Sequence, residues 1–264
     1  MTMFILAYLA VGCLTGMLAG LFGIGGGIIS VPILTWLFAW QGFAPDSLLI
    51  MAIASSLAAI IFTALASVRA HQRLGAMQWS IAYQLSVPIG VGAAMGAGLA
   101  EAMPVLWLRH LLVVFLCYVA LLMAFPRKKS TPTTINSRYV DMGVGWFIGV
   151  ISALVGIGGG TLTVPYLLLR PLPMAQVVAL SSACGLPIAI VGSISYAVLG
   201  WQHPDLPWGS VGYVYLPATL SISLSSILTA PLGAKWANKL PSAQLKRYFS
   251  VLLILIAGKL LWAG

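Results

Sequence analysis

The first 45 residues of this chain contain no aspartate, glutamate, lysine, arginine or histidine. Six further charge-free runs follow, and only 6% of the 264 residues are charged, where a soluble domain has about a quarter. A helix crosses the hydrocarbon core of a bilayer with about 20 apolar residues, and these runs lack the alternation of a membrane strand. We therefore expect an all-α polytopic membrane protein. The runs are 1–45, 47–68, 74–100, 111–126, 142–169, 171–202 and 206–234.

A repeated phrase divides the chain into two halves. Gly-Ile-Gly-Gly-Gly occurs at 23–27 and again at 156–160, and Val-Pro follows each copy at the same spacing. A serine pair comes next in each half, and then a segment that carries proline and two adjacent basic residues. This order predicts two homologous membrane repeats, 1–126 and 142–264, joined by a polar cytoplasmic linker, 127–141.

The basic residues predict how the halves cross the membrane. If each short segment after the glycines turns back through the bilayer, eleven of the 13 lysines and arginines fall on one side. If it does not, the two sides carry seven and six, so the positive-inside rule favours the first scheme. An odd number of passes per half makes the second half an inverted copy of the first. The expected long segments are 3–22, 47–67, 79–100, 105–125, 142–156, 176–199, 209–233 and 246–263, about eight, and the two short broken segments are 28–40 and 161–169.

The glycine phrases predict discontinuous helices. Three consecutive glycines break a helix, and the next helix begins with free backbone N–H groups and a positive dipole end, which favour an anion. No Lys-Ser or Lys-Thr follows either copy, so the phrases do not predict nucleotide binding, although tight helix packing remains an alternative. The glycine-rich run 90–100 predicts such packing. The expected anion-binding residues are Gly23, Gly25, Gly26, Gly27, Ser55, Ser56, Gly156, Gly158, Gly159, Gly160, Ser181 and Ser182.

Together, the paired glycine phrases with Val-Pro, the serine-rich segments and the proline-led last segment of each half resemble the TauE/SafE family of sulfite exporters (TSUP). The resemblance covers nearly the whole chain. It implies a permease for a small sulfur-containing or carboxylated anion. It does not fix the solute.

We expect a secondary transporter of a small sulfur-containing or organic anion such as sulfite, thiosulfate or a sulfonate, working by alternating access around two glycine-rich helix breaks that face each other near the midplane of the membrane. An anion channel, or a membrane partner protein without transport activity, stays open as an alternative. We expect no enzymatic activity, no catalytic residue, no metal and no cofactor. The net charge of +9 comes from short loops, so we expect no nucleic-acid partner, only the solute and membrane lipids, and a homo-oligomer stays open. A retained N-terminal segment in a bacterial plasma (inner) membrane is the expected location.

Overall fold

The structure is a computed structural model that describes residues 2–22, 26–73, 75–124, 138–237 and 242–262. The side chains of 21, 22, 234–237, 242–249, 261 and 262 are not described. Gly23 and Gly25, two of the expected anion-binding residues, lie outside the described residues.

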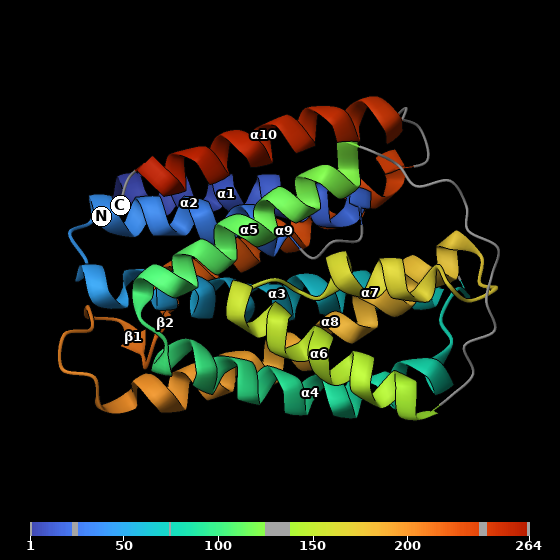
Figure 1. Cartoon of the computed structure of the whole chain (residues 1–264). Helices are drawn as coiled ribbons and strands as arrows, with labels where there is room; N and C mark the ends of the chain where they lie inside the picture. The colour runs from blue at the N-terminus through green and yellow to red at the C-terminus, as the bar shows by residue number, and fades with distance from the viewer. Residues whose placement is uncertain (1, 23–25, 74, 125–137, 238–241, 263–264) are drawn as a thin grey trace.

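The regular secondary structure of the described residues is helical, apart from one short hairpin (Figure 1). The first half contains α1 (Thr2–Phe22), α2 (Gly27–Trp40), α3 (Pro45–Arg73), α4 (Trp79–Ala102) and α5 (Val105–Ala124). The second contains α6 (Arg138–Val155), α7 (Gly160–Leu167), α8 (Met174–Leu199), a 3₁₀ turn (Gly200–Gln202), β1 (Ser210–Val211), β2 (Val214–Tyr215), α9 (Leu216–Ala237) and α10 (Ser242–Trp262).

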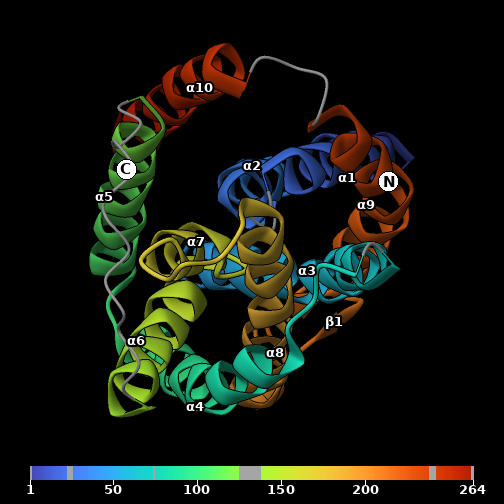
Figure 2. The same cartoon turned by 90° about the vertical axis from the view of Figure 1, so that its right-hand side faces the viewer.

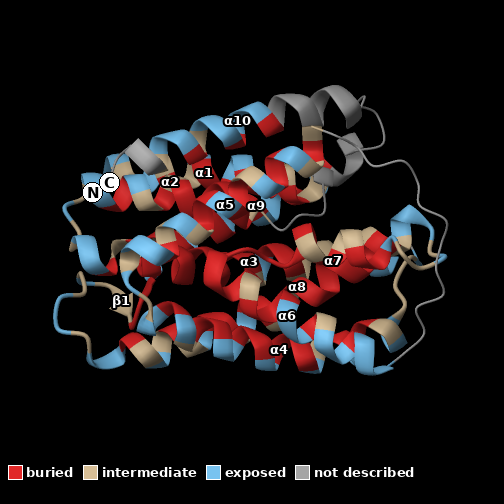
Figure 3. Ribbon diagram, in the orientation of Figure 1, coloured by how far each residue is buried: buried red, intermediate tan, exposed pale blue. Residues whose placement is uncertain are grey.

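Two helices form the centre of the bundle. α3 and α8 pack against each other, and 78% and 67% of their apolar windows are buried, compared with 33% in α1 and 39% in α5. α1 packs on α9, α6 packs on α4, and α5 pairs with α10 at the periphery (Figure 2). The buried residues concentrate on α3, α7 and α8, while the outer helices present exposed faces (Figure 3). The exposed side chains on those faces are largely apolar, as expected for surfaces that contact lipid.

Seven helices in the described part of the chain are long and apolar enough to cross a membrane: α1, α3, α4, α5, α6, α8 and α9. The expected all-α polytopic membrane fold is therefore confirmed. The eighth expected long segment, 246–263, corresponds to α10, whose described apolar stretch, Ser250–Leu260, is shorter. Both expected short segments also form helices, α2 and the eight-residue α7.

Two helix starts differ from the expected segments. The segment 209–233 does not begin as a membrane helix, because Ser210 pairs with Tyr215 in an antiparallel hairpin and α9 starts only at Leu216. Gly212, with φ 53°, provides the turn that a helix cannot continue through. In addition, α6 begins at Arg138, inside the stretch expected to be linker.

Glycines allow two pairs of helices to approach closely. A Cβ on Gly92 of α4 would lie 2.1 Å from the Trp146 carbonyl oxygen, and one on Gly149 of α6 would lie 2.1 Å from that of Ile89. The run 90–100 therefore contributes close helix packing, as predicted. Gly16 of α1 packs in the same way on the backbone of α9. Close backbone contact of this kind holds helices together in lipid, where the hydrophobic effect does not.

The two ends of the bundle carry different charges. The end where α3 finishes and α4, α6 and α8 begin is called the basic end here (Figure 1, right). It carries Arg69, Arg73, Arg138 and Arg170. The opposite end, where α3 begins and α4 and α8 finish, carries Asp46, Glu101 and Asp205.

Candidate functional site at the two glycine breaks

The second glycine phrase stops one helix and starts another. Gly156 adopts φ 75° just after the last residue of α6, and the Ile157 N–H donates to the Ser152 carbonyl at 2.9 Å, which is a Schellman C-cap. Gly159 adopts φ 74° and forms the N-cap of α7. Left-handed backbone of this kind strongly favours glycine, so both positions explain why the phrase is rich in this residue.

The first phrase has the same local geometry where the structure describes it. Gly26 adopts φ 68° as the N-cap of α2, in the position that Gly159 takes before α7. Neither helix start has a side-chain cap. The first N–H groups of each helix therefore lack an acceptor one turn earlier, and each start presents donors and a positive dipole end.

The two breaks touch each other at the centre of the molecule. A Cβ on Gly27 would lie 2.5 Å from the Gly156 carbonyl oxygen and 2.9 Å from the Ile157 Cα atom. Ser56 of α3 donates a hydrogen bond to the same Gly156 oxygen at 3.0 Å, and its Oγ lies 2.6 Å from Ser30 Oγ. Residues more than a hundred positions apart in the sequence are thus joined by backbone contact and by hydroxyls.

From this contact the two short helices run in opposite directions. α2 leads to the start of α3, whereas α7 leads to the basic end, where α8 starts (Figure 1). Gln78, just before α4, donates to Gln176 of α8 at 2.9 Å, which places the start of α8 beside the end of α3. Each short helix therefore joins the centre of the bundle to a different end.

Two small cavities flank the breaks and share Ile60 and Thr63 of α3. The volume that the centre of a water molecule can occupy is about 30 Å³ in the larger cavity and about 10 Å³ in the smaller. One water needs about 10–15 Å³ of this volume, so the larger cavity holds about two waters in this conformation. The smaller is lined by Thr15, Gly26, Ser30, Ser56, Ala59, Ile60, Thr63 and Ile222. The larger is lined by Ala19, Gly20, Ile60, Thr63, Ala64, Ala66, Ser67, Ala70, His71, Gly158, Ser181, Ser182, Gly185, Ala230 and Pro231.

The four expected serines have different surroundings. Ser55 lies outside both cavities and accepts a hydrogen bond from the Tyr215 N–H of β2 at 2.9 Å. Ser56 lines the smaller cavity, and Ser181 and Ser182 line the larger. Ser182 Oγ lies 2.9 Å from Ser67 Oγ.

The expected glycines also lie in different surroundings. Gly26 lines the smaller cavity and Gly158 the larger, whereas Gly27 and Gly156 form the contact between the breaks. Gly160 is buried as the first residue of α7, directly after Gly159.

Several cavity residues were not predicted. Thr63, Ser67 and His71 continue from Ser56 along one face of α3 at helical spacing and lead from the centre to the basic end. This periodicity of small and polar residues was present in the sequence and could have marked the face. Among the side chains that the structure describes, His71 is the one titratable group that lines either of these two cavities.

The electrostatic environment of the two cavities favours an anion. Among the described residues no carboxylate lines either one, and the polar groups that do are hydroxyls, the His71 imidazole and backbone of the two glycine breaks. Arg69 and Arg73 are exposed in the last turns of α3, at the end to which the larger cavity leads. An anion near the centre would thus meet donors and partial positive charge without a fixed counter-charge.

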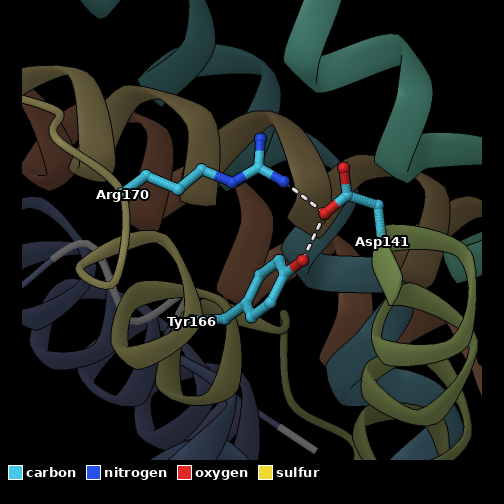
Figure 4. Close-up of polar contacts among 3 residues, drawn as sticks. All are labelled: Asp141, Tyr166 and Arg170. Carbon is cyan, nitrogen blue, oxygen red and sulfur yellow. Dashed lines mark hydrogen bonds and ion pairs between the residues drawn. The ribbon is translucent and has the colours of Figure 1, made fainter. Parts of the chain in front are cut away.

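A buried ionic cluster holds the second short helix (Figure 4). Asp141 of α6 accepts hydrogen bonds from Tyr166 of α7 and from Arg170, just after α7. The Asp141 and Arg170 side chains are only 8% and 11% exposed. Burial alone would lower the pKa of the Arg170 guanidinium, but hydrogen bonding to Asp141 raises it, and the net pKa lies above its ordinary value. The sequence interpretation placed Asp141 in a linker and treated Arg170 as a topology signal, because the pairing spans 29 residues and has no local motif.

The first half ties its short helix in a related way. Gln41, just after α2, donates a hydrogen bond to Tyr8 of α1, and the Tyr8 ring is buried. Each short helix is therefore fastened to the helix before it, through a neutral pair in the first half and an ionic cluster in the second.

Comparison with known proteins follows this geometry. A family model described as "Sulfite exporter TauE/SafE" matches residues 8–260. The chain is 37% identical over 258 residues to a "Probable membrane transporter protein" of Haemophilus influenzae, covering 96% of this chain and 97% of that protein. It is 29% identical over 254 residues to "Probable membrane transporter protein MJ0441" of Methanocaldococcus jannaschii, covering 92% and 90%. It is 25% identical over 273 residues to "Probable membrane transporter protein YunE" of Bacillus subtilis, covering 96% of each. No solved structure matches the chain.

Proposed function

The chain belongs to the TauE/SafE sulfite exporter family of membrane transporters, which are not enzymes, and from this premise we propose that it is a secondary transporter of a small anion such as sulfite, thiosulfate or a sulfonate. One observation carries the proposal: the start of α2 meets the second glycine break at the centre of the bundle, and the two short helices that follow the breaks run to opposite ends. Broken helices whose N-termini face a midplane site are the common device by which secondary carriers bind an anionic group.

The helix contacts support an inverted repeat. Exchanging the halves maps α1 on α6, α3 on α8 and α4 on α9. The contact of α1 with α9 then corresponds to that of α6 with α4, and the contact of α3 with α9 to that of α8 with α4. The opposite directions of α2 and α7 fit the same exchange (Figure 1). Two halves related in this way can rock against each other and open a central site to each side in turn.

The small cavities favour a carrier over an open pore. A volume that admits about two waters is too small for an anion of four or more heavy atoms. In this proposal the conformation described here is a closed state, and the halves move to admit a solute. A continuous anion channel would need no such movement.

We further propose that the basic end faces the cytoplasm of a bacterial inner membrane, with the repeats 1–126 and 142–264 joined by a linker on that side. In a background without Cys13, Cys117 and Cys184, a Gln72→Cys variant is expected to react with a membrane-impermeant maleimide only from the cytoplasmic side. A Trp208→Cys variant is expected to react only from the outside, since both side chains are exposed at opposite ends. Labelling of both from one side would exclude this topology.

Flux into vesicles tests the function itself. Purified protein in liposomes is expected to give saturable uptake of labelled sulfite or thiosulfate, with sulfoacetate, taurine and acetate tested in parallel. Ionic currents far above carrier turnover would indicate a channel instead. Absence of flux for every anion, in protein that remains folded, would favour the alternative of a membrane partner without transport activity.

A further inference from the structure

The four paired serines differ in one respect that bears on where the anion binds. Ser55, Ser56 and Ser182 each have hydrogen-bond partners within the protein. Ser181 is fully buried, yet its Oγ has no partner among the described residues. A buried hydroxyl without a partner is costly, and at a functional site it indicates a group that completes its hydrogen bond only when a ligand arrives.

The unpartnered hydroxyl lies at the second break. Ser181 lines the larger cavity together with Gly158, two residues before α7 begins. Thr161, in the first turn of α7, is 7% exposed, and its Oγ1 also lacks a partner among the described residues. The second break therefore has one unpartnered hydroxyl in the cavity beside Gly158 and another in the first turn of α7, although Thr161 lines neither cavity. The first N–H groups of α7 also lack an acceptor one turn earlier.

At the first break the hydroxyls are already engaged. Ser30 Oγ and Ser56 Oγ lie 2.6 Å apart, and Ser56 donates to the Gly156 carbonyl oxygen of the other break. These contacts join the halves and leave a cavity of about 10 Å³. The hydroxyls of the first break therefore serve to join the two halves.

The asymmetry has a structural origin in the connections after α3 and α8. The β1–β2 hairpin after α8 brings the Tyr215 N–H within 2.9 Å of Ser55. The connection between α3 and α4 forms no strand within its described residues, 75–78, and gives Ser181, the counterpart of Ser55, no such donor. In the equivalent pair Ser55 and Ser181, the first hydroxyl is thus used for structure and the second has no partner among the described residues.

We infer that the two breaks have different roles: the second break binds the anion, and the first is a fixed joint that holds the halves together. This inference rests on the proposed transport function. An oxyanion at the second break accepts hydrogen bonds from Ser181 Oγ and from the first N–H groups of α7, because an oxyanion supplies acceptors only, and donors are what this position offers. The larger cavity then leads along α3 to the basic end.

Three serine-to-alanine variants test this division, each measured by sulfite flux in liposomes and by thermal unfolding in detergent, with thiosulfate as a second probe. Ser181→Ala removes a hydroxyl that the resting protein does not use. It is expected to raise KM by about tenfold or more, since a hydrogen bond to a charged group is lost, while the unfolding midpoint stays unchanged or rises. Ser56→Ala is expected to lower the midpoint and the maximal rate, with KM within about twofold of the wild type.

Ser193→Ala is the matched control. Ser193 is buried on the same helix as Ser181, donates to the Ile190 carbonyl oxygen and lines neither cavity, so its KM should stay at the wild-type value. A normal KM in Ser181→Ala together with a raised KM in Ser56→Ala would overturn the inference and leave the transport function standing. If wild-type liposomes transport neither sulfite nor thiosulfate, the proposed function fails and the inference with it.

Discussion

Replacing Gly27 by alanine is expected to abolish transport and to lower the unfolding midpoint by several degrees. The added Cβ would lie 2.5 Å from the Gly156 carbonyl oxygen and 2.9 Å from the Ile157 Cα atom, both backbone atoms that cannot rotate away. The breaks must therefore separate, which also breaks the hydrogen bond from Ser56 to Gly156. Overpacking of this kind costs about 1–3 kcal/mol or more, and here the strain falls on the contact that joins the two glycine breaks.

The matched control is Gly98→Ala. Gly98 lies within α4, where an added Cβ meets nothing within 4 Å, so alanine should be tolerated and should favour the helix by up to about 1 kcal/mol. The measurement is the initial flux rate and the thermal unfolding midpoint of each variant, compared with those of the wild type. Wild-type flux and stability in the Gly27 variant would mean that the two glycine phrases do not touch in the working protein.

Removing one partner of the buried ionic cluster is expected to lower the stability of the protein strongly. Arg170→Gln leaves Asp141 buried with only the Tyr166 hydroxyl as a partner, and breaking a buried pair in this way costs about 3–5 kcal/mol. Because the cluster fastens the end of α7 to α6, transport should fall together with stability. Thermal unfolding and flux of the single variants provide the measurement.

A double-mutant cycle separates the ionic contact from other effects of the substitutions. The double variant Asp141→Asn with Arg170→Gln removes both charges and should recover much of the stability lost in the single variants. Tyr166→Phe, which removes one hydrogen bond and leaves the ion pair, should cost only about 1 kcal/mol. Simple additivity of the two single losses would show that Asp141 and Arg170 do not interact.

The local features of this protein could be predicted from its sequence. Charge-free runs predicted the membrane helices, because lipid requires long apolar segments. The run of three glycines predicted that the chain breaks at 156–160, since Gly156 and Gly159 need a backbone conformation that other residues rarely adopt. The distribution of arginine and lysine predicted which loops gather at one end.

The candidate site could be predicted only in part. The sequence marked four serines as equivalent, but the structure shows Ser55 engaged by a hairpin backbone and Ser181 without a partner among the described residues. The contact between Gly27 and Gly156 was expected in outline, whereas the use of Ser56 as the link between them was not. Neither outcome has a local sequence signal, because each depends on a partner about a hundred or more positions away.

The amino-acid sequence by itself determined the solvent in which the chain folds, the positions of its helices and the two points at which they break. These follow from hydropathy and backbone sterics, which act within a turn or two of helix. The tertiary structure alone decided which hydroxyls are engaged, where Asp141 meets Arg170 and which glycine break keeps donors free. Those pairings depend on how the two halves pack, and packing brings together residues that no short-range pattern relates.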